Sequence, residues 1–172
     1  LGPTGIGNGV VEGSKVTIEF VGERIIVKHG WTEMGQGVNT VAIQCVCEEL
    51  DVNSCDIDVV IDTSVEHNTG MTTASRATSL LCNAIIDACK QIRNDISVLG
   101  IEGIEGNVYT GEWVVDWTDS IDAKGSGSNT HYSYSYATQV VTLDDSGQID
   151  TVFAAHDAGR IINPVLFEGQ LE

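Results

Sequence analysis

The stretch that decides the fold is WTEMGQGVNTVAIQCVCEEL, residues 31–50. Its second half predicts a helix of about three to four turns, because apolar residues recur near helical spacing: Val38, Val41, Ala42, Cys45 and Leu50. Gly35-Gln36-Gly37 stands directly before this helix and exposes its backbone. The start of the helix is therefore either a plain turn or a place where an anionic ligand sits.

Strand-like segments lie on both sides of this helix. KVTIEFV, residues 15–21, alternates polar and apolar side chains, and so does the segment 24–27. Gly22-Glu23 separates them, which predicts a β-hairpin. CDIDVVI, residues 55–61, is typical of another strand. The order strand, helix, strand indicates a helix packed on a sheet.

A second, longer helix is predicted from about Ala74 to Val98, with Gly100 as its stop signal. Its apolar residues form one stripe along the helix: Ala77, Leu81, Ala84, Ile85, Ala88, Cys89, Ile92 and Ile96. Because alanine and cysteine are small, this stripe predicts close approach to a sheet or to another helix.

The last third of the chain is predicted to be mostly strands. One strand is expected over 112–117, and two more over 132–143 and 149–155, joined by the turn residues DDSG. Asn163-Pro164 favours a final helix start. The predicted class is α+β, a mixed β-sheet with two or three packed helices. We expect residues 1–172 to be part of one domain, which allows two lobes, 1–100 and 101–172.

Composition restricts the partners of the chain. Eight basic residues against 25 acidic ones give a net charge of −17, which repels nucleic acid and anionic membranes. One bound phosphate is still allowed, because backbone N–H groups can supply local positive potential. No apolar run approaches the roughly 20 residues of a membrane span. No signal peptide is recognisable, and the final FEGQLE has no helix stop signal, so we expect a fragment of a longer protein.

Catalytic and metal-binding patterns are weak. An odd count of five cysteines without disulfide spacing favours a reducing, cytoplasmic location. Cys45 and Cys47 would point to different sides of a helix, and the sequence has no second Cys or His pair at the spacing of a zinc site. We therefore predict that no side chain of the chain ligates a metal. GxSxG and GxxxxGK[ST] are absent. The acidic pairs Glu48-Glu49 and Asp144-Asp145 are typical of solvated charge. We therefore assign no catalytic residue.

Three glycine-containing polar segments each precede or begin a helix: MGQG at 34–37, GMTTASRAT at 70–78 and INPVLFEGQ at 162–170. A helix start exposes unpaired N–H donors and a partial positive charge. In the second segment hydroxyl donors are expected in the first helical turn, with Arg76 as a charged clamp. Plain capping and turn roles explain each segment alone, and for the three together the capping and anion-binding interpretations both stay open.

These segments carry a resemblance. TEMGQGVNT from Thr32, GMTTASRATSLLCNAI from Gly70 and HDAGRIINPVLFEGQLE from His156 occur in the order seen in the molybdenum hydroxylase family. The chain is similar to the molybdopterin-binding large subunit of xanthine dehydrogenases and aldehyde oxidoreductases. The resemblance covers residues 9–172 except for about 101–130.

The resemblance implies a molybdenum-cofactor-binding domain whose side chains do not ligate the metal. The cofactor would be molybdopterin, with or without a cytosine dinucleotide extension, and would be held by neutral donors. The residues implied are Gly35, Gln36 and Gly37, the turn Thr72, Thr73, Ala74, Ser75, Arg76, Ala77 and Thr78, and Gln170.

The family reaction hydroxylates a purine, another N-heterocycle or an aldehyde with oxygen from water. Its catalytic glutamate belongs to a GEPP-like segment that these 172 residues lack. The resemblance thus implies a fragment that cradles cofactor without the catalytic base. Implied partners are the rest of the molybdenum subunit, iron–sulfur and FAD modules, and a small-molecule substrate. The alternative is a binding or scaffold domain that keeps the fold without the cofactor.

Overall fold

A four-stranded sheet in the order β4-β3-β2-β5 forms the centre of the computed structural model. The structure describes residues 2–4, 7–61, 66–67, 69–122, 128–131 and 133–171. Strands β2 (Glu12–Val21) and β3 (Arg24–His29) form the predicted antiparallel hairpin, and β5 (Val108–Val115) pairs antiparallel with β2. Strand β4 (Ile57–Val60) runs parallel to β3, so the sheet is mixed as predicted.

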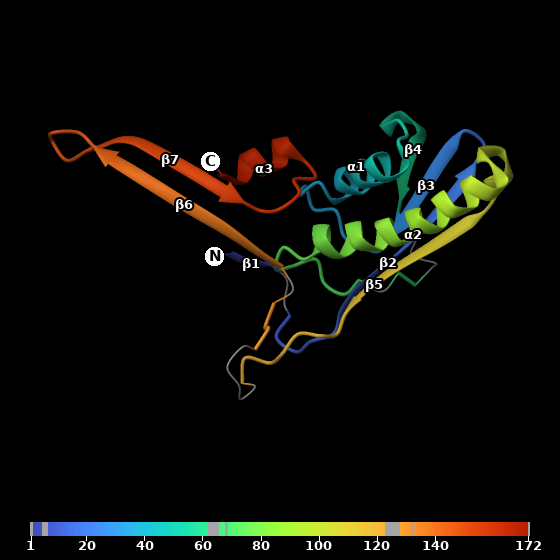
Figure 1. Ribbon diagram of the computed structural model, residues 1–172, viewed down its shortest axis with the longest axis horizontal. Helices are drawn as coiled ribbons and strands as arrows, with labels where there is room; N and C mark the ends of the chain where they lie inside the picture. The colour runs from blue at the N-terminus through green and yellow to red at the C-terminus, as the bar shows by residue number, and fades with distance from the viewer. Residues whose placement is uncertain are drawn as a thin grey trace.

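Helices α1 (Val38–Leu50) and α2 (Ala77–Leu99) lie side by side on one face of this sheet, as Figure 1 shows. The contact between α2 and β5 is very close: a Cβ built on Gly111 would lie 2.0 Å from the carbonyl oxygen of Ala84 and 2.6 Å from the nitrogen of Ala88. The close approach predicted from the alanines of α2 is therefore confirmed. Sheet and helices enclose one apolar core, whose fully buried members include Val16, Ile18, Val27, Leu80, Leu81 and Ile85. We call this sheet with α1 and α2 the body.

A second sheet, in the order β1-β6-β7, extends away from the body (Figure 1). Its long hairpin of β6 (Ser133–Leu143) and β7 (Ile149–Asp157), here called the arm, turns at the predicted residues. In that turn Asp144 Oδ1 accepts hydrogen bonds from the nitrogens of Ser146, 2.8 Å, and Gln148, 2.9 Å. The remaining elements are β1 (Gly2–Thr4), α3 (Pro164–Leu171) and two 3₁₀ turns, Ser54–Asp56 and Ile101–Ile104.

Some predicted boundaries are wrong. Helix α2 begins at Ala77 and not at Ala74, because Ala74 and Ser75 have left-handed φ values of 53° and 54° that cannot continue a right-handed helix. Strand β5 ends at Val115 and not at residue 117. The predicted strand start at Tyr132 lies outside the described residues. Because β5 pairs with β2 and β1 with β6, strand pairing crosses residue 100, and the division into two lobes stays a prediction.

All five cysteines are free, and three of them are buried: Cys45, Cys82 and Cys89. Cys45 Sγ donates to the carbonyl oxygen of Cys82 at 3.7 Å, and burial raises the pKa of Cys89 to about 12. Within the described ranges, no helix has both the length and the apolarity to cross a membrane. In the same residues, His, Cys, Asp and Glu side chains form no group of three that could hold a metal ion.

Candidate functional site

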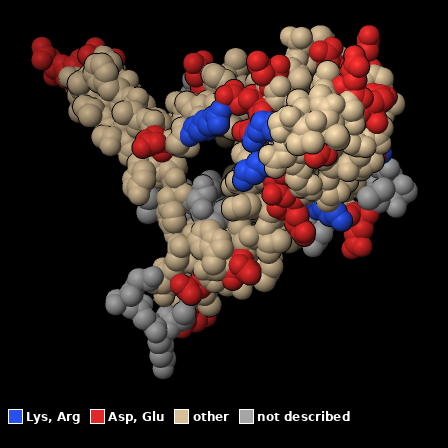
Figure 2. Space-filling view, turned by 45° about the vertical axis from the view of Figure 1, so that its right-hand side comes forward, with Lys and Arg blue, Asp and Glu red and all other residues tan. Residues whose placement is uncertain are grey.

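A cavity of about 610 Å³ lies where three distant parts of the chain meet: the start of α1, the turn before α2, and the segment from 158 to 170 that contains α3. Figure 2 shows the molecule hollowed between the arm and the body, with basic side chains beside the hollow. The cavity is lined by ten of the eleven residues that the resemblance implies: Gly35, Gln36, Thr72, Thr73, Ala74, Ser75, Arg76, Ala77, Thr78 and Gln170. The structure thus brings the three predicted segments together.

Gly37, the eleventh residue, is not part of the described lining and stands at the N-terminus of α1. Its φ of 83° is left-handed, and a Cβ there would lie 2.9 Å from Leu166 Cδ1. The left-handed backbone therefore favours glycine here, and a larger residue would also have to displace the Leu166 side chain of α3.

The start of α1 already holds an anion, and this anion belongs to the protein. Glu33 Oε1 accepts hydrogen bonds from the nitrogens of Gly35, 2.8 Å, and Gly37, 3.0 Å. Its Oε2 accepts from the nitrogen of Asn39 at 3.1 Å. These bonds, that from Asn39 foremost, lower the pKa of Glu33. Of the two interpretations of this helix start, the structure shows an anion of the protein's own, and contact of Gly35 or Gly37 with a bound group stays a prediction.

The amide of Gln36 also bonds within its own loop. Its Oε1 accepts from the nitrogen of Met34 at 2.6 Å, and its Nε2 donates to the carbonyl oxygen of Thr32 at 2.8 Å. The amide thereby fixes the loop while Gln36 still lines the cavity. A bond from its second Nε2 hydrogen to a bound group stays a prediction.

The turn before α2 presents hydroxyls from outside the helix. Thr72, Thr73 and Ser75 precede the first residue of α2, and only Thr78 stands in its first turn, so the predicted placement of all four hydroxyls in that turn is wrong. The nitrogen of Arg76 donates to the carbonyl oxygen of Thr73 at 3.3 Å, which closes the turn. Thr72 Oγ1 accepts from the nitrogen of Thr32 at 3.1 Å, which ties this turn to the loop before α1.

Arg76 points its guanidinium into the protein interior. The residue is 4% exposed, and its Nη1 donates to the carbonyl oxygens of Thr69, 2.8 Å, and Met71, 2.5 Å. Its Nη2 forms an ion pair with Glu12 Oε2. The guanidinium therefore binds the turn and the sheet, and its contact with a ligand as a charged clamp stays a prediction.

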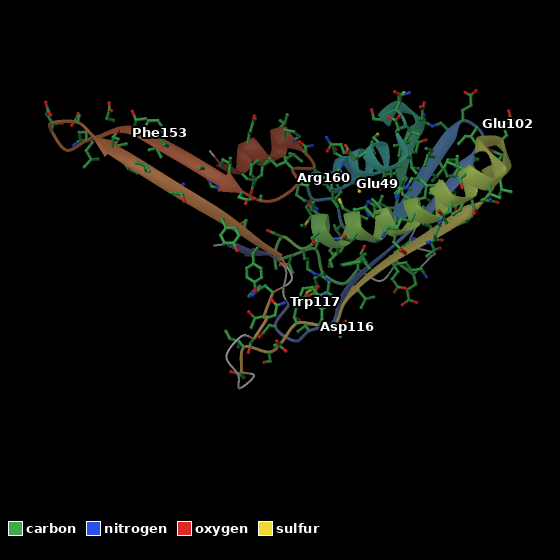
Figure 3. All side chains as sticks on the ribbon, in the orientation of Figure 1. Glu49, Glu102, Asp116, Trp117, Phe153 and Arg160 are labelled. Atoms are coloured by element: carbon green, nitrogen blue, oxygen red, sulfur yellow. The ribbon has the colours of Figure 1, made fainter. Side chains whose placement is uncertain are left out.

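The third wall contains residues that sequence reasoning missed. Arg160 lines the cavity and pairs with Glu48 of α1, both side chains being 63% exposed. Asn163 accepts from the nitrogen of Leu166 at 2.9 Å, which confirms it as the cap of α3, and donates to Gln44 Oε1 at 2.9 Å. Figure 3 shows Arg160 in the loop that joins β7 of the arm to α3, near α1. The other missed lining residues are Met34, Val41, Ala158, Ile161, Ile162, Leu166 and Phe167.

The electrostatic character of the cavity is opposite to that of the chain. The chain carries 25 acidic residues, yet no Asp or Glu is among the described residues that line this cavity. The lining combines hydroxyl and amide donors with the Arg160 guanidinium over an apolar floor. Such a donor set fits a planar group that carries phosphate, because neutral donors and one guanidinium can hold phosphate oxygens without a basic patch.

Comparisons with known proteins show the family and the fold of the chain. A family model described as "Molybdopterin cofactor-binding domain" matches residues 2–105. Mouse xanthine dehydrogenase/oxidase is 28% identical over 184 residues, which cover 94% of this chain and 14% of the mouse protein. The gamma subunit of the 6-hydroxypseudooxynicotine dehydrogenase complex of Paenarthrobacter nicotinovorans is 27% identical, covering 96% of this chain and 25% of that subunit.

Among solved structures, the aldehyde oxidoreductase of Desulfovibrio gigas superposes with a TM-score of 0.75 at 24% identity. The match covers 99% of this chain and 21% of that protein, and it supports the fold. The chain thus spans a quarter or less of each of these relatives.

Proposed function

The chain belongs to the molybdopterin cofactor-binding domain family of the molybdenum hydroxylases, and we propose that its three-walled cavity is part of the cradle that holds this cofactor. The observation that carries the proposal is the convergence of Gln36, Ser75 and Gln170 on one cavity whose described lining residues include no carboxylate. These residues come from three separate segments, and a plain capping role for each segment gives no reason for them to meet.

The residues present fit the chemistry of the group. The hydroxyls of Thr72, Thr73 and Ser75 would donate to phosphate oxygens, and Arg160 would supply the one lining guanidinium not already held in the interior. The apolar floor would exclude water from one face of the pterin. When bound, the cofactor supplies the metal centre at which a substrate is oxidised. This chain's own residues bind and orient it.

We further propose that the protein works as an oxidoreductase on an N-heterocycle or an aldehyde. The base that removes a proton during the reaction would come from outside the described cavity lining, because none of the described lining residues has a carboxyl group. Partners carrying iron–sulfur clusters and FAD would take up the electrons. The free cysteines are consistent with a reducing, cytoplasmic location.

The cofactor content of the protein, purified in its native assembly, tests this proposal. Molybdenum is measured by mass spectrometry of the metal, and pterin by the fluorescence of the released group. Gln170→Ala should lower both contents, while Gln148→Ala in the exposed turn of the arm should leave them unchanged. Equal contents in wild type and Gln170→Ala would contradict the cradle and favour the scaffold alternative.

A further inference from the structure

We propose that Glu12 and Arg76 form a buried strut that positions the cofactor-facing turn from behind. The turn is Met71–Ser75, and the strut joins it to strand β2 of the body. Neither side chain needs to touch the cofactor for this role. The inference rests on the proposed function, since it concerns the same cavity.

The contacts of Arg76 span three parts of the chain: strand β2, Trp31 and the segment 69–71. Its guanidinium pairs with Glu12 on β2 and donates to the carbonyl oxygens of Thr69 and Met71. Its Cζ lies 5.0 Å from the ring centroid of Trp31, whose Nε1 donates to Ser14 Oγ at 2.9 Å. The side chains of Arg76 and Glu12 are only 5% and 2% exposed. The guanidinium is therefore held on several sides by the body.

A buried ion pair of this kind is not explained by stability alone. Removing two charges from water is so costly that well-packed apolar residues often stabilise a protein as much or more. What an apolar pair could not do is bind the carbonyl oxygens at 69 and 71, which fix the path of the chain into the turn. The guanidinium of Arg76 also packs closely against Gly70, because a Cβ on Gly70 would lie 3.2 Å from Arg76 Nη1.

The turn itself needs outside support. Ala74 and Ser75 both adopt left-handed φ values, and non-glycine residues keep such conformations where the surroundings fix them. The strut attaches at Met71, three residues before Ala74, and at Arg76, directly after Ser75. Without it, the hydroxyls of Thr72, Thr73 and Ser75 would lose their placement relative to Gln170. A binding site misplaced by about 1 Å loses much of its affinity.

The test separates positioning from general stability. Glu12→Gln keeps the shape of the side chain and removes the charge opposite Arg76. The control is a substitution at Ile92, fully buried in α2 and absent from the cavity lining, chosen as Val or Ala to match the melting temperature of Glu12→Gln. Both variants are made in the native assembly. Hydrogen exchange of residues 69–76 is measured without cofactor, and molybdenum and pterin contents are measured well below the melting temperature.

In Glu12→Gln, we expect the amide hydrogens of the turn to exchange about tenfold faster than in wild type. We also expect this variant to hold several-fold less molybdenum and pterin. Effects of this size are expected when a hydrogen bond to a charged group is lost. The Ile92 control should show neither change. Arg76→Lys carries the same test if Glu12→Gln does not fold, because lysine keeps the charge but cannot bind both carbonyl oxygens and the carboxylate.

Equal losses in Glu12→Gln and in the Ile92 control would overturn the strut, and so would an unchanged cofactor content in Glu12→Gln. Gln170→Ala distinguishes this failure from that of the proposed function. If Gln170→Ala loses cofactor and Glu12→Gln does not, the strut is wrong and the cradle stands. If neither loses cofactor, the cradle is wrong and the strut fails with it.

Discussion

Leu166 of α3 lies directly over Gly37 at the start of α1, so near that a Cβ on Gly37 would come within 2.9 Å of Leu166 Cδ1. This contact sets the distance between two of the three cavity walls. It joins the loop that carries Gln36 to the helix that carries Gln170. The two walls are therefore in direct contact here, and a methyl group on Gly37 would disturb that contact.

Gly37→Ala should lower both stability and cofactor content. Alanine at a φ of 83° costs about 1–2 kcal/mol of folding free energy, and its methyl would push α3 outward. Gly147→Ala is the matched control, because Gly147 has the same φ of 83° and a methyl group there would meet nothing within 4 Å. Thermal unfolding should show similar losses for both variants, while only Gly37→Ala should lose molybdenum. Equal cofactor content in the two variants would contradict the role of this contact.

Arg160 and Glu48 should act in opposite directions on phosphate binding. Their ion pair is exposed, so it contributes at most about 1 kcal/mol and Arg160 can exchange partners readily. Arg160→Gln should weaken binding of inorganic pyrophosphate about tenfold, as expected for the loss of one charged hydrogen bond. Glu48→Gln should strengthen that binding, because it frees the guanidinium.

Glu49→Gln is the control for this pair, since Glu49 lies next to Glu48 and pairs instead with Arg93. It changes the net charge by the same amount. Titration calorimetry at low salt measures all three variants. If Glu49→Gln raises the affinity for pyrophosphate as much as Glu48→Gln does, then net charge alone, and not release of Arg160, sets the affinity.

His29 should make the protein less stable in mild acid. Burial, with a smaller contribution from the nearby His67, lowers the pKa of His29 from 6.5 to about 4. The unfolded state therefore binds a proton more readily, and stability falls as pH drops from about 6.5 to 4, by at most about 1.4 kcal/mol per pH unit. Urea unfolding between pH 4 and 7 measures this slope. His29→Gln should flatten it, and an unchanged slope would assign it to other groups.

Glu33 should stabilise the protein at neutral pH and lose this effect in acid. Its folded-state pKa is lowered below the ordinary value of 4.5, first by the hydrogen bond from Asn39. Its contribution is thus complete above pH 4.5 and disappears as pH falls through the lower folded-state pKa. Glu33→Gln should melt at a lower temperature than wild type at pH 7, with the difference shrinking below pH 4.5.

Glu23→Gln, in the turn between β2 and β3, is the control for this substitution. It removes the same charge without touching α1. A melting difference for Glu33→Gln that persists unchanged at low pH would show that the carboxylate charge is not what caps the helix.

Much of the fold was predictable because its signals are local. The alternation of polar and apolar residues in β2 and β3 marks their pairing, and the alanines at 84 and 88 mark the face of α2 that meets β5. The three cavity segments were found by their glycines and hydroxyls. In each of these cases, the size and spacing of side chains within a short segment are enough to predict the local structure.

The inner contacts of the site were not predictable, because they join residues far apart in sequence. Nothing near Arg76 indicates that its partner is Glu12, and nothing near Arg160 indicates Glu48. Glu33 is a local case that was missed: a carboxylate just before a glycine turn can cap the following helix itself. The left-handed Ala74 and Ser75 were hidden as well, since their sequence equally suits a helical first turn.

The most direct test of the central claim is anomalous X-ray diffraction at the molybdenum absorption edge, on crystals of the protein in its native assembly. We predict that the strongest anomalous peak lies at the cavity, within a pterin's length of Gln36, Ser75 and Gln170. A molybdenum peak far from this cavity, or electron density showing these three residues in contact with protein segments only, would contradict the account.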